Sequence, residues 1–409
     1  MNAEILSIGT ELLLGEIVDA NAAFLAGELA VLGINVYWIS QVGDNRGRLE
    51  EAIRRALERS NVVLTTGGLG PTDDDMTREA IAAVLGEGPV IDHELERTLR
   101  ARFRAMGREM PEKNLKQAWL ISSAEPLPNP LGTAPGWWVT APDGRVIGSM
   151  PGVPSEMRTM WTEQARHRLE HLADGVFVAV TLKTFGPGES AIEERLGDLV
   201  KAANPSVATY AKRDGVQVRV AARAADRKQA RALVDPVVER VKRILGAEVV
   251  GADDDSLASV VGDLLQARHH SVASAESITG GLIASYLTDV PGSSGYVLGG
   301  LVAYNEDVKR GFGVADEVLQ EHGVVSAETA LALADAARDR FGASFGIGST
   351  GVAGPGAHGG ENPGLAFVAV TSIDQRQSRQ VRRIAPRETV KHFVALSALD
   401  LLRRMLLDK

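Results

Sequence analysis

Hydrophobic and polar positions alternate with two different periods along the first 172 residues. Short apolar, β-branched runs predict strands, and apolar residues at every third or fourth position predict amphipathic helices. We therefore expect strands at 5–8, 36–42 and 62–66 and helices at 22–32 and 49–60. Gly33 is a helix stop, and Asp44 or Asn45 is suited to cap the second helix. This alternation predicts a doubly wound α/β domain with a parallel sheet, residues 1–172.

Further patterns predict two more segments. Residues 137–140 and 146–149 flank a Pro-Asp-Gly turn, which indicates a hairpin. Residues 173–250 follow the order strand, helix, two strands, helix, which predicts a small α/β connecting module. This segment holds more Lys and Arg than Asp and Glu, although the whole chain has a net charge of -9. Solvated helix faces explain the local excess, and a weak nucleic-acid surface is the alternative. Gly186-Pro187-Gly188-Glu189 does not supply the GXXG loop of a KH domain.

The last segment, residues 251–409, again alternates between the two periods. It starts with a predicted linker at 251–256, which contains three consecutive aspartates. We expect helices at 257–268, 280–289, 326–341 and 388–407 and strands at 271–275, 297–303, 345–349, 365–372 and 379–384. The pattern predicts a second α/β domain with its own core.

Composition narrows the class of protein. A hydrophobic fraction of 44% and a charged fraction of 24% are typical of a globular protein. Residues 1–8 lack a signal-peptide pattern, and no apolar run has the roughly 20 residues of a membrane span. The chain has no cysteine, which excludes disulfides and fits a reducing cytoplasmic interior. The acidic balance argues against nucleic acid as the main partner.

A glycine-rich loop follows the third predicted strand. Gly67, Gly68 and Gly70 let backbone amides approach an anion, and a helix N-terminus comes next. Asp73, Asp74 and Asp75 follow directly and would repel an anionic ligand, so a divalent cation such as Mg²⁺ resolves the conflict. The alternative is that Thr72 or Asp73 only caps the helix.

Two other loops are expected at the same edge, beyond the carboxyl ends of the strands. They are 9–11, with Thr10 and Glu11, and 151–157, with Gly152 and Ser155. Asp44 follows the second strand and is expected in the same crevice.

The runs GTELLLG, TTGGLGPT with its aspartates, and PGVPSEM resemble the CinA (competence- and damage-inducible protein A) family over residues 1–172. The resemblance implies a MoaB-like, molybdopterin-binding fold that hydrolyses ADP-ribose to AMP and ribose 5-phosphate with a divalent cation (Mg, Mn or Co). It implies Asp44, Asp74 and Asp75 as metal ligands, with Asp75 also catalytic, whereas Asp73 stands at a variable position of the family. It implies substrate contacts from Thr10, Glu11, Gly67, Gly68, Gly70, Thr72, Gly152 and Ser155.

The C-terminal third contains Ala275-Glu276-Ser277-Ile278-Thr279-Gly280-Gly281, then Ala303-Tyr304-Asn305 and Lys309. Without cysteine, a serine activated by a lysine is the natural nucleophile. Ser277 ends a strand, where the N–H groups of Thr279, Gly280 or Gly281 can meet an oxyanion. Burial would lower the pKa of Lys309 toward that of a base. Tyr304 is a candidate to relay the proton or orient the serine. The competing interpretation is that Ser277 caps a helix.

This last domain also resembles its CinA-family counterpart, an amidohydrolase that deamidates nicotinamide mononucleotide (NMN). The matching runs include AES-x-TGG, GG-x-VAYN, GVVSAETA and TG-x-AGP, spread over about eighty residues. The resemblance implies Ser277 as nucleophile and Lys309 as base, without a metal, and substrate contacts from Thr350, Gly351, Gly354 and Arg387. Ile278 stands where the family often has Cys, and Ala357-His358 lengthens the glycine loop.

The sequence thus predicts a bifunctional hydrolase of pyridine-nucleotide salvage, with NMN and ADP-ribose as substrates and, from the resemblance, a homodimer. Two alternatives stay open: a first domain that binds a nucleotide or molybdopterin-type ligand without turnover, and a nucleic-acid accessory protein.

Overall fold

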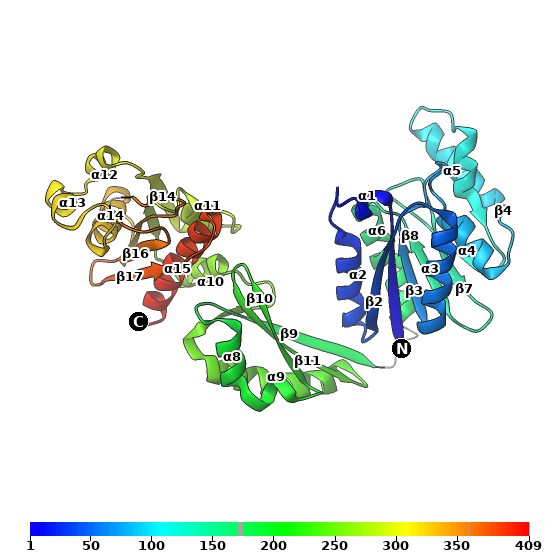
Figure 1. Cartoon of the computed structure of the whole chain (residues 1–409), viewed down its shortest axis with the longest axis horizontal. Helices are drawn as coiled ribbons and strands as arrows, with labels where there is room; N and C mark the ends of the chain where they lie inside the picture. Colours follow the sequence, from blue (N-terminus) through cyan, green and yellow to red (C-terminus); the bar gives the residue numbers. More distant parts are fainter. Residues whose placement is uncertain (171–174, 359, 409) are drawn as a thin grey trace. The chain divides into compact units, whose positions relative to one another are not determined.

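The chain folds into two compact units in a computed structural model that describes residues 1–170, 175–358 and 360–408 (Figure 1). Unit 1 comprises residues 1–178 and 222–233, and unit 2 comprises residues 179–221 and 234–409. The predicted boundary at residues 172 and 173 lies outside the described residues. Within the described part of the chain, none of the helices combines the length and apolar character of a membrane span.

The N-terminal domain contains eight strands and seven α-helices within its described residues. The strands are β1 (Asn2–Ile8), β2 (Asn35–Val42), β3 (Val62–Thr66), β4 (Val90–Ile91), β5 (Trp119–Leu120), β6 (Ala124–Leu127), β7 (Gly136–Thr140) and β8 (Val146–Met150). The α-helices are α1 (Thr10–Leu13), α2 (Ala20–Val31), α3 (Arg46–Arg59), α4 (Thr77–Leu85), α5 (His93–Ala105), α6 (Pro154–Met160) and α7 (Arg166–Glu170). A 3-10 helix η1 (Glu112–Ala118) and a π-helical segment η2 (Trp161–Ala165) complete the domain.

Six of these strands form one mixed sheet in the order β2-β1-β3-β8-β7-β6. The neighbours β2, β1, β3 and β8 run parallel, as the alternating pattern predicts, while β8, β7 and β6 are antiparallel. The expected hairpin is therefore present as β7 and β8. β4 and β5 form a separate two-stranded sheet.

Helices cover both faces of this sheet. On one face, Leu25 and Leu29 of α2 share a buried core with Met157 and Met160 of α6. On the other, α3 and α4 supply the apolar side chains, and the two layers are visible around the blue strands in Figure 1. Of the two residues expected to cap α3, Asn45 does so by accepting the N–H of Arg48. Asp44 therefore does not cap α3, and its carboxylate is available to another part of the domain.

The middle module has the expected order and one further strand. Its elements are β9 (Val176–Thr184), α8 (Glu189–Leu196), η3 (Gly197–Lys201), β10 (Ser206–Lys212), β11 (Gly215–Ala224), α9 (Arg227–Leu245), η4 (Gly246–Glu248) and β12 (Val249–Ala252). They form a four-stranded sheet in the order β10-β11-β9-β12. The expectation that a linker starts at residue 251 is wrong, because β12 pairs with β9 through Ala252. Asp253 prolongs this contact, since its carboxylate accepts the N–H of Thr181 at 2.9 Å.

The C-terminal domain matches the expected elements closely and adds two short helices. Its strands are β13 (Val272–Glu276), β14 (Val297–Val302), β15 (Phe345–Gly351), β16 (Leu365–Thr371) and β17 (Arg376–Arg382). Its helices are α10 (Leu257–Ala267), α11 (Leu282–Thr288), η5 (Ser293–Gly295), α12 (Glu306–Phe312), α13 (Asp316–His322), α14 (Ala327–Phe341) and α15 (Arg387–Leu407). The sequence pattern missed α12 and α13.

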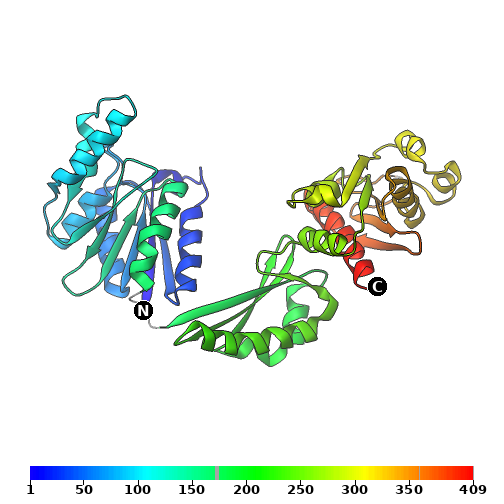
Figure 2. The same ribbon diagram turned by 180° about the vertical axis from the view of Figure 1, so that it is seen from behind.

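The five strands form one sheet in the order β14-β13-β15-β16-β17. β13 is parallel to both β14 and β15, and the last two strands are antiparallel. α10, α11 and α15 pack on one face, and α14 packs on the other through Leu333 and Ala337. α15, red in Figures 1 and 2, contributes the longest apolar face to this core.

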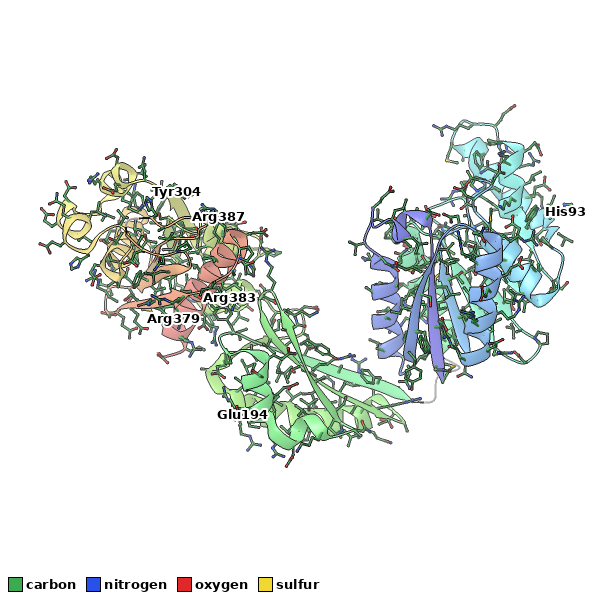
Figure 3. The ribbon with its side chains drawn as sticks, viewed as in Figure 1. His93, Glu194, Tyr304, Arg379, Arg383 and Arg387 are labelled. Atoms are coloured by element: carbon green, nitrogen blue, oxygen red, sulfur yellow. The ribbon has the colours of Figure 1, made fainter. Side chains whose placement is uncertain are left out.

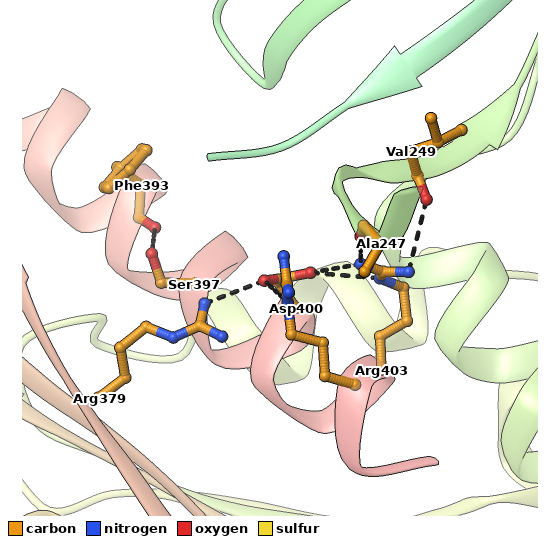
Figure 4. A network of polar contacts seen from close by, with 8 residues as sticks. Ala247, Val249, Arg379, Phe393, Ser397, Asp400 and Arg403 are labelled. Atoms are coloured by element: carbon orange, nitrogen blue, oxygen red, sulfur yellow. Dashed lines mark hydrogen bonds and ion pairs between the residues drawn. The ribbon is translucent and has the colours of Figure 1, made fainter. Parts of the chain in front are cut away.

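Within unit 2, a buried ion network joins the last helix to the end of the middle module (Figure 4). The Asp400 carboxylate accepts hydrogen bonds from Arg379, Arg403 and Arg404. Arg403 in turn donates to the carbonyl oxygens of Ala247 and Val249. Asp400 and Arg403 are only 1% and 3% exposed, so the network is part of the core rather than of the surface.

Candidate functional sites

The predicted N-terminal crevice is present as a cavity of about 550 Å³. It lies where the parallel strands end, since its lining includes residues that directly follow β1, β2, β3 and β8. The predicted residues that line it are Glu11, Asp44, Gly67, Gly68, Gly70, Asp74, Asp75 and Gly152. The structure therefore brings four separate loops to one place.

Asp44 is held by the loop that follows β1. Its Oδ2 accepts the backbone N–H of Thr10 at 2.8 Å and the Thr10 hydroxyl at 2.7 Å. Both bonds use the same carboxylate oxygen, which leaves Oδ1 available to a ligand. Thr10 thus positions Asp44 and is not itself among the residues that line the cavity.

Two glycines of the loop after β3 are required by close contacts. Gly67 has φ +106°, and a Cβ there would collide with the carbonyl oxygen of Ile8. A Cβ at Gly68 would collide with the Thr77 hydroxyl, which donates to the Gly67 carbonyl oxygen at 2.9 Å. Only a residue without a side chain lets this loop pass so close to β1 and α4.

The three aspartates in the turn after the glycines have different surroundings. α4 begins after Met76 with no side-chain cap, so the alternative that Thr72 or Asp73 caps this helix is wrong. Thr72 instead donates its N–H to Asp75 Oδ2 at 2.9 Å. Asp73 is not among the cavity lining and pairs with Lys113 at 3.2 Å. Asp74 and Asp75 line the cavity, whereas Asp73 does not.

The structure does not place every predicted residue at the cavity. Ser155 is exposed in the first turn of α6, and the lining from this loop comes from Gly152, Val153 and Glu156. Sequence reasoning missed Glu156, whose carboxylate accepts from Asn129 at 2.7 Å. The only signal for it was its place within the run PGVPSEM.

Arg78 is a second residue that sequence reasoning missed. It is fully buried and donates to the carbonyl oxygens of Leu69 at 2.8 Å and Pro135 at 2.7 Å. Burial lowers its pKa to about 10, so it stays charged near neutral pH. It ties the glycine loop to the segment that carries Thr133 and Ala134, which also line the cavity.

The electrostatics of the cavity favour a cation. Five carboxylates line it, from Glu11, Asp44, Asp74, Asp75 and Glu156, and no lysine or arginine is among its described lining residues. Within the described chain, however, no three acidic or histidine side chains are close enough to form a metal cage by themselves. This donor set fits a cation that one or two carboxylates hold together with substrate phosphates, which is the usual mode for Mg²⁺.

The second site is in the C-terminal domain, where Ser277 and Lys309 meet. Lys309 Nζ donates to Ser277 Oγ at 3.1 Å and to the carbonyl oxygen of Tyr304 at 3.0 Å. The lysine is 3% and the serine 7% exposed. Burial lowers the pKa of Lys309, while the nearby Glu306 carboxylate acts in the opposite direction. Ser277 does not cap a helix, because the cap of α11 is Gly281.

The turn after Ser277 is organised by Glu276, to which sequence reasoning gave no role. This carboxylate is 1% exposed and accepts the N–H groups of Gly281, Ile283 and Ala284 at 2.8–3.0 Å. The N–H of Gly281 is therefore committed, which narrows the predicted oxyanion site to Thr279 and Gly280. The signal in the sequence was an acidic residue at the end of an apolar strand.

Neighbouring contacts fix the same turn to β15. The Ser277 N–H donates to the carbonyl oxygen of Ser349 at 2.9 Å, and the Thr279 hydroxyl lies 2.7 Å from the Ser349 hydroxyl. Thr279 is fully buried, backbone included, so of the two remaining donors only the N–H of Gly280 belongs to an exposed residue. A Cβ at Gly280 would lie 3.4 Å from Lys391 Nζ, which places a further cation beside the turn.

Tyr304 and Arg387 form a second pair at this site (Figure 3). Arg387 donates to the Tyr304 hydroxyl and to the carbonyl oxygen of Gly354, both at 2.8 Å. The hydroxyl of Tyr304 is thus directed to Arg387, whereas its backbone carbonyl holds Lys309. The contact that positions Lys309 comes from the main chain of Tyr304 and not from its phenol.

These residues surround a cavity of about 540 Å³. Of the predicted residues, Ser277, Tyr304, Lys309, Thr350, Gly351, Gly354 and Arg387 line it. Thr279, Gly280 and Gly281 are not among the lining residues. Ile278 and His358 are lining residues too, while Gly359 of the same loop lies outside the described residues.

The fold and the two cavities define an α/β protein with a MoaB-like first domain and a separate serine-lysine site. Comparison with known families agrees with this division. Residues 4–171 match the family described as "Probable molybdopterin binding domain", residues 180–251 the "Damage-inducible protein CinA KH domain", and residues 254–406 the "CinA C-terminal domain". No GXXG run occurs within 180–251, although the matching family is described as a KH domain.

Relatives match the chain over its full length. A CinA-like protein of Frankia casuarinae is 44% identical and covers 99% of this chain and 96% of its own. One of Gloeobacter violaceus is 42% identical, with 100% and 97% covered. A crystal structure of the protein CinA, of unknown function, from Thermoplasma acidophilum is 35% identical over 41% of this chain and 96% of its own, with a TM-score of 0.38. The chain belongs to the CinA family.

Proposed function

We propose that the C-terminal domain is an amidohydrolase that converts NMN and water to nicotinate mononucleotide and ammonia. The observation that carries this proposal is the 3.1 Å contact between the buried Lys309 amine and the Ser277 hydroxyl. A lysine whose pKa is lowered by burial is suited to take the serine proton. Serine-lysine pairs are a recurring variant of the serine constellation that cleaves amide bonds.

The reaction divides into two balanced steps. Ser277 Oγ attacks the carboxamide carbon, and its proton passes to Lys309. The carbon–nitrogen bond then breaks, and the nitrogen takes that proton and leaves as ammonia. Water adds to the resulting ester with Lys309 again as base, which releases the carboxylate and restores the serine. The backbone N–H of Gly280 is the proposed donor to the negative oxygen of both steps.

The remainder of the cavity supports a mononucleotide as ligand. Arg387 supplies a positive charge at the rim, and the Thr350–Gly354 segment supplies backbone close to it. The volume of about 540 Å³ is in the range of small-molecule sites. An arginine and glycine-rich backbone are the usual partners of a phosphate.

The proposal is tested by ammonia release from NMN in the presence of a chelator. Ser277→Ala and Lys309→Ala should each abolish release, while Ser285→Ala, an exposed serine of α11, should behave as wild type. Near-full release from Ser277→Ala would exclude the acyl-enzyme. Folded wild-type protein without any release would exclude the activity.

A second function is favoured by the acidic N-terminal cavity. We propose that this domain hydrolyses ADP-ribose to AMP and ribose 5-phosphate. Five lining carboxylates without a basic residue would repel a diphosphate, so one or two of Asp44, Asp74 and Asp75 are proposed to hold a divalent cation together with it. When bound, the cation would neutralise the diphosphate and polarise the bond that breaks. Asp75 is the proposed catalytic carboxylate, which the Thr72 N–H orients.

Chelation should stop ADP-ribose hydrolysis while NMN deamidation continues in the same sample. Asp44→Asn and Asp75→Asn should lower the metal-dependent rate, and Asp73→Asn, at a residue that is not among the cavity lining, is the matched control. Hydrolysis that survives chelation would exclude the metal. Calorimetric binding of ADP-ribose without product would instead make the domain a binding module.

A further inference from the structure

A small recess adjoins the N-terminal cavity and has no assigned role. Its volume is about 90 Å³, and it shares Ile8, Glu11 and Gly152 with the lining of the larger cavity. It extends from there toward the start of α2, where Asp19 and Asn21 line it. A ligand in the larger cavity therefore lies next to this recess.

Two buried polar atoms in the recess lack hydrogen-bond partners among the described residues: Ser7 Oγ and Asn21 Oδ1. Ser7 is 0% and Asn21 7% exposed. An unpartnered buried polar group is costly, so such atoms indicate a missing partner. Two of them in one small recess indicate that a polar group binds there.

The orientation of the Asn21 amide is fixed by its neighbours. Its Nδ2 donates to the carbonyl oxygen of Gly152 at 2.8 Å and to Thr66 Oγ1 at 2.8 Å. The Gly152 carbonyl oxygen can only accept, and the Thr66 hydroxyl already donates to the Pro151 carbonyl oxygen. The nitrogen must face these groups, which leaves Oδ1 as an acceptor for the ligand.

The charge around the recess selects the kind of group. Glu11 and Asp19 also line it, and their carboxylates can only accept hydrogen bonds. The donors among the described lining side chains are the hydroxyls of Ser7 and Thr66 and the amide nitrogen of Asn21, which is already bonded. A phosphate would be repelled, whereas neutral hydroxyl groups would donate to these oxygens. The volume corresponds to about three water molecules of ~30 Å³ each, which admits two adjacent hydroxyl groups but not a purine base.

We propose that this recess binds the vicinal diol of a ribosyl group, with Asn21 Oδ1 and Ser7 Oγ as its partners. The inference rests on the proposed N-terminal function, which supplies a ribosyl diphosphate to the adjoining cavity. Acidic side chains bind ribose hydroxyls in the same way in dinucleotide-binding folds. Ser7 and Asn21 are then specificity residues, which select ribosyl over deoxyribosyl ligands.

ADP-ribose has two ribosyl groups, and two analogues distinguish them. One analogue carries 2-deoxyribose on the adenosine side, and the other carries it at the far end. In wild type, one analogue should show a KM about tenfold higher than ADP-ribose, the effect expected for one lost hydrogen bond. In Ser7→Ala, the KM for ADP-ribose should rise to a similar degree. The KM for the analogue that wild type disfavours should not rise further in Ser7→Ala.

Ser60→Ala is the matched control, because the Ser60 hydroxyl is also buried and unpartnered but is not among the recess lining. It should leave every KM unchanged. Two results would overturn the proposal and identify the recess as a water site. One is that wild type has equal KM values for ADP-ribose and both analogues. The other is that Ser7→Ala raises all three KM values equally. The wild-type comparison decides the case even if Ser7→Ala fails to fold.

The proposed function and the recess can fail separately. If wild type does not hydrolyse ADP-ribose, the proposed function fails. Calorimetry then tests the recess by comparing the affinity for AMP with that for 2'-deoxy-AMP, and the affinity for ribose 5-phosphate with that for its 2-deoxy form. A preference of about tenfold for one ribosyl ligand, lost in Ser7→Ala, supports the recess. No preference in either pair overturns it.

Discussion

The amine of Lys309 lies 3.1 Å from the hydroxyl of Ser277, although 32 residues separate them in the sequence. The end of β13 delivers the serine, and the first turn of α12 delivers the lysine. Both side chains are buried, and the carbonyl oxygen of Tyr304 holds the amine from the other side. The proposed nucleophile and its proposed base are therefore already in contact without a substrate.

The pH dependence of deamidation should follow the pKa of Lys309. The neutral amine is the base, so the rate should rise as pH increases through this pKa, which burial places below the ordinary value of 10.5. Glu306 favours the charged amine and raises the pKa. Glu306→Gln should therefore shift the pH–rate profile to lower pH, as measured by kcat for NMN.

Asp307→Asn on the same helix is the control for this shift, because Asp307 is exposed and does not act on the Lys309 pKa. Superimposable profiles for wild type and Glu306→Gln would show that Lys309 is not the group that limits the rate.

Glu276 is expected to be a positioning residue for the oxyanion turn. In Glu276→Gln, one carboxylate oxygen becomes an NH₂ that faces a backbone N–H, so a bond to Gly281, Ile283 or Ala284 is lost. We expect a loss of about 1–3 kcal/mol in stability. We also expect kcat for NMN to fall about tenfold or more with little change in KM, since the turn acts on the transition state.

Steady-state kinetics and thermal unfolding of the same preparation measure both effects. Glu328→Gln, an exposed glutamate in the first turn of α14, is the matched control. A Glu276→Gln protein with lower stability but unchanged kcat would make Glu276 a purely structural residue.

Arg78 is expected to maintain the glycine loop of the N-terminal cavity. Arg78→Met leaves the carbonyl oxygens of Leu69 and Pro135 without their donor inside the core. We expect about 2–4 kcal/mol of destabilisation and a large loss of ADP-ribose hydrolysis. NMN deamidation in the same sample should persist, because Arg78 belongs to unit 1 and the Ser277 site belongs to unit 2.

Arg78→Lys keeps the charge but supplies one donor group in place of a fork, so it should restore activity only partly. Full ADP-ribose hydrolysis by Arg78→Met would show that the loop keeps its shape without the arginine.

Local sequence patterns were sufficient to predict the main helices and strands and the loops that follow them. The strands that deliver Asp44, Gly67 and Ser277 are short apolar runs, and the carboxyl ends of parallel strands must meet at one edge. α12 and α13 escaped prediction because each buries only one apolar side chain over seven residues, whereas the equally short α11 buries Ile283 and Leu287 at helical spacing. Their packing depends on Phe312 and Leu319 within the tertiary core.

The roles of Glu276 and Arg78 depend on geometry that no local pattern contains. Glu276 reaches three N–H groups only because Gly280 and Gly281 turn the chain with φ of +61° and +96°. Arg78 binds a carbonyl oxygen 57 residues away. The capping preferences of Thr and Asp predicted that Thr72 or Asp73 would cap α4. Neither residue does, and Thr72 instead donates its N–H to the Asp75 carboxylate.

The buried carboxylate of Asp400 should make unit 2 sensitive to acid (Figure 4). Burial raises its pKa, but hydrogen bonds from Arg403, Arg379 and Arg404 outweigh this, and the pKa lies below the ordinary value of 3.8. A carboxyl with a lowered pKa in the folded state stabilises the fold above its unfolded pKa, and this contribution is lost as pH falls through the folded value. The acid-dependent loss should therefore occur below about pH 4.

Asp400→Asn removes the charge that three arginines share, one of which, Arg403, is only 3% exposed. Breaking a buried ion network from one side costs about 3–5 kcal/mol, so we expect a loss of this size near neutral pH. The remaining stability should depend less on pH below 4 than in wild type. Chemical unfolding at a series of pH values measures both, with the exposed Asp408→Asn as control. Equal stability of Asp400→Asn and wild type at pH 7 would mean that the arginines find other partners, such as the carbonyl oxygens of Ala247 and Val249 that Arg403 already binds.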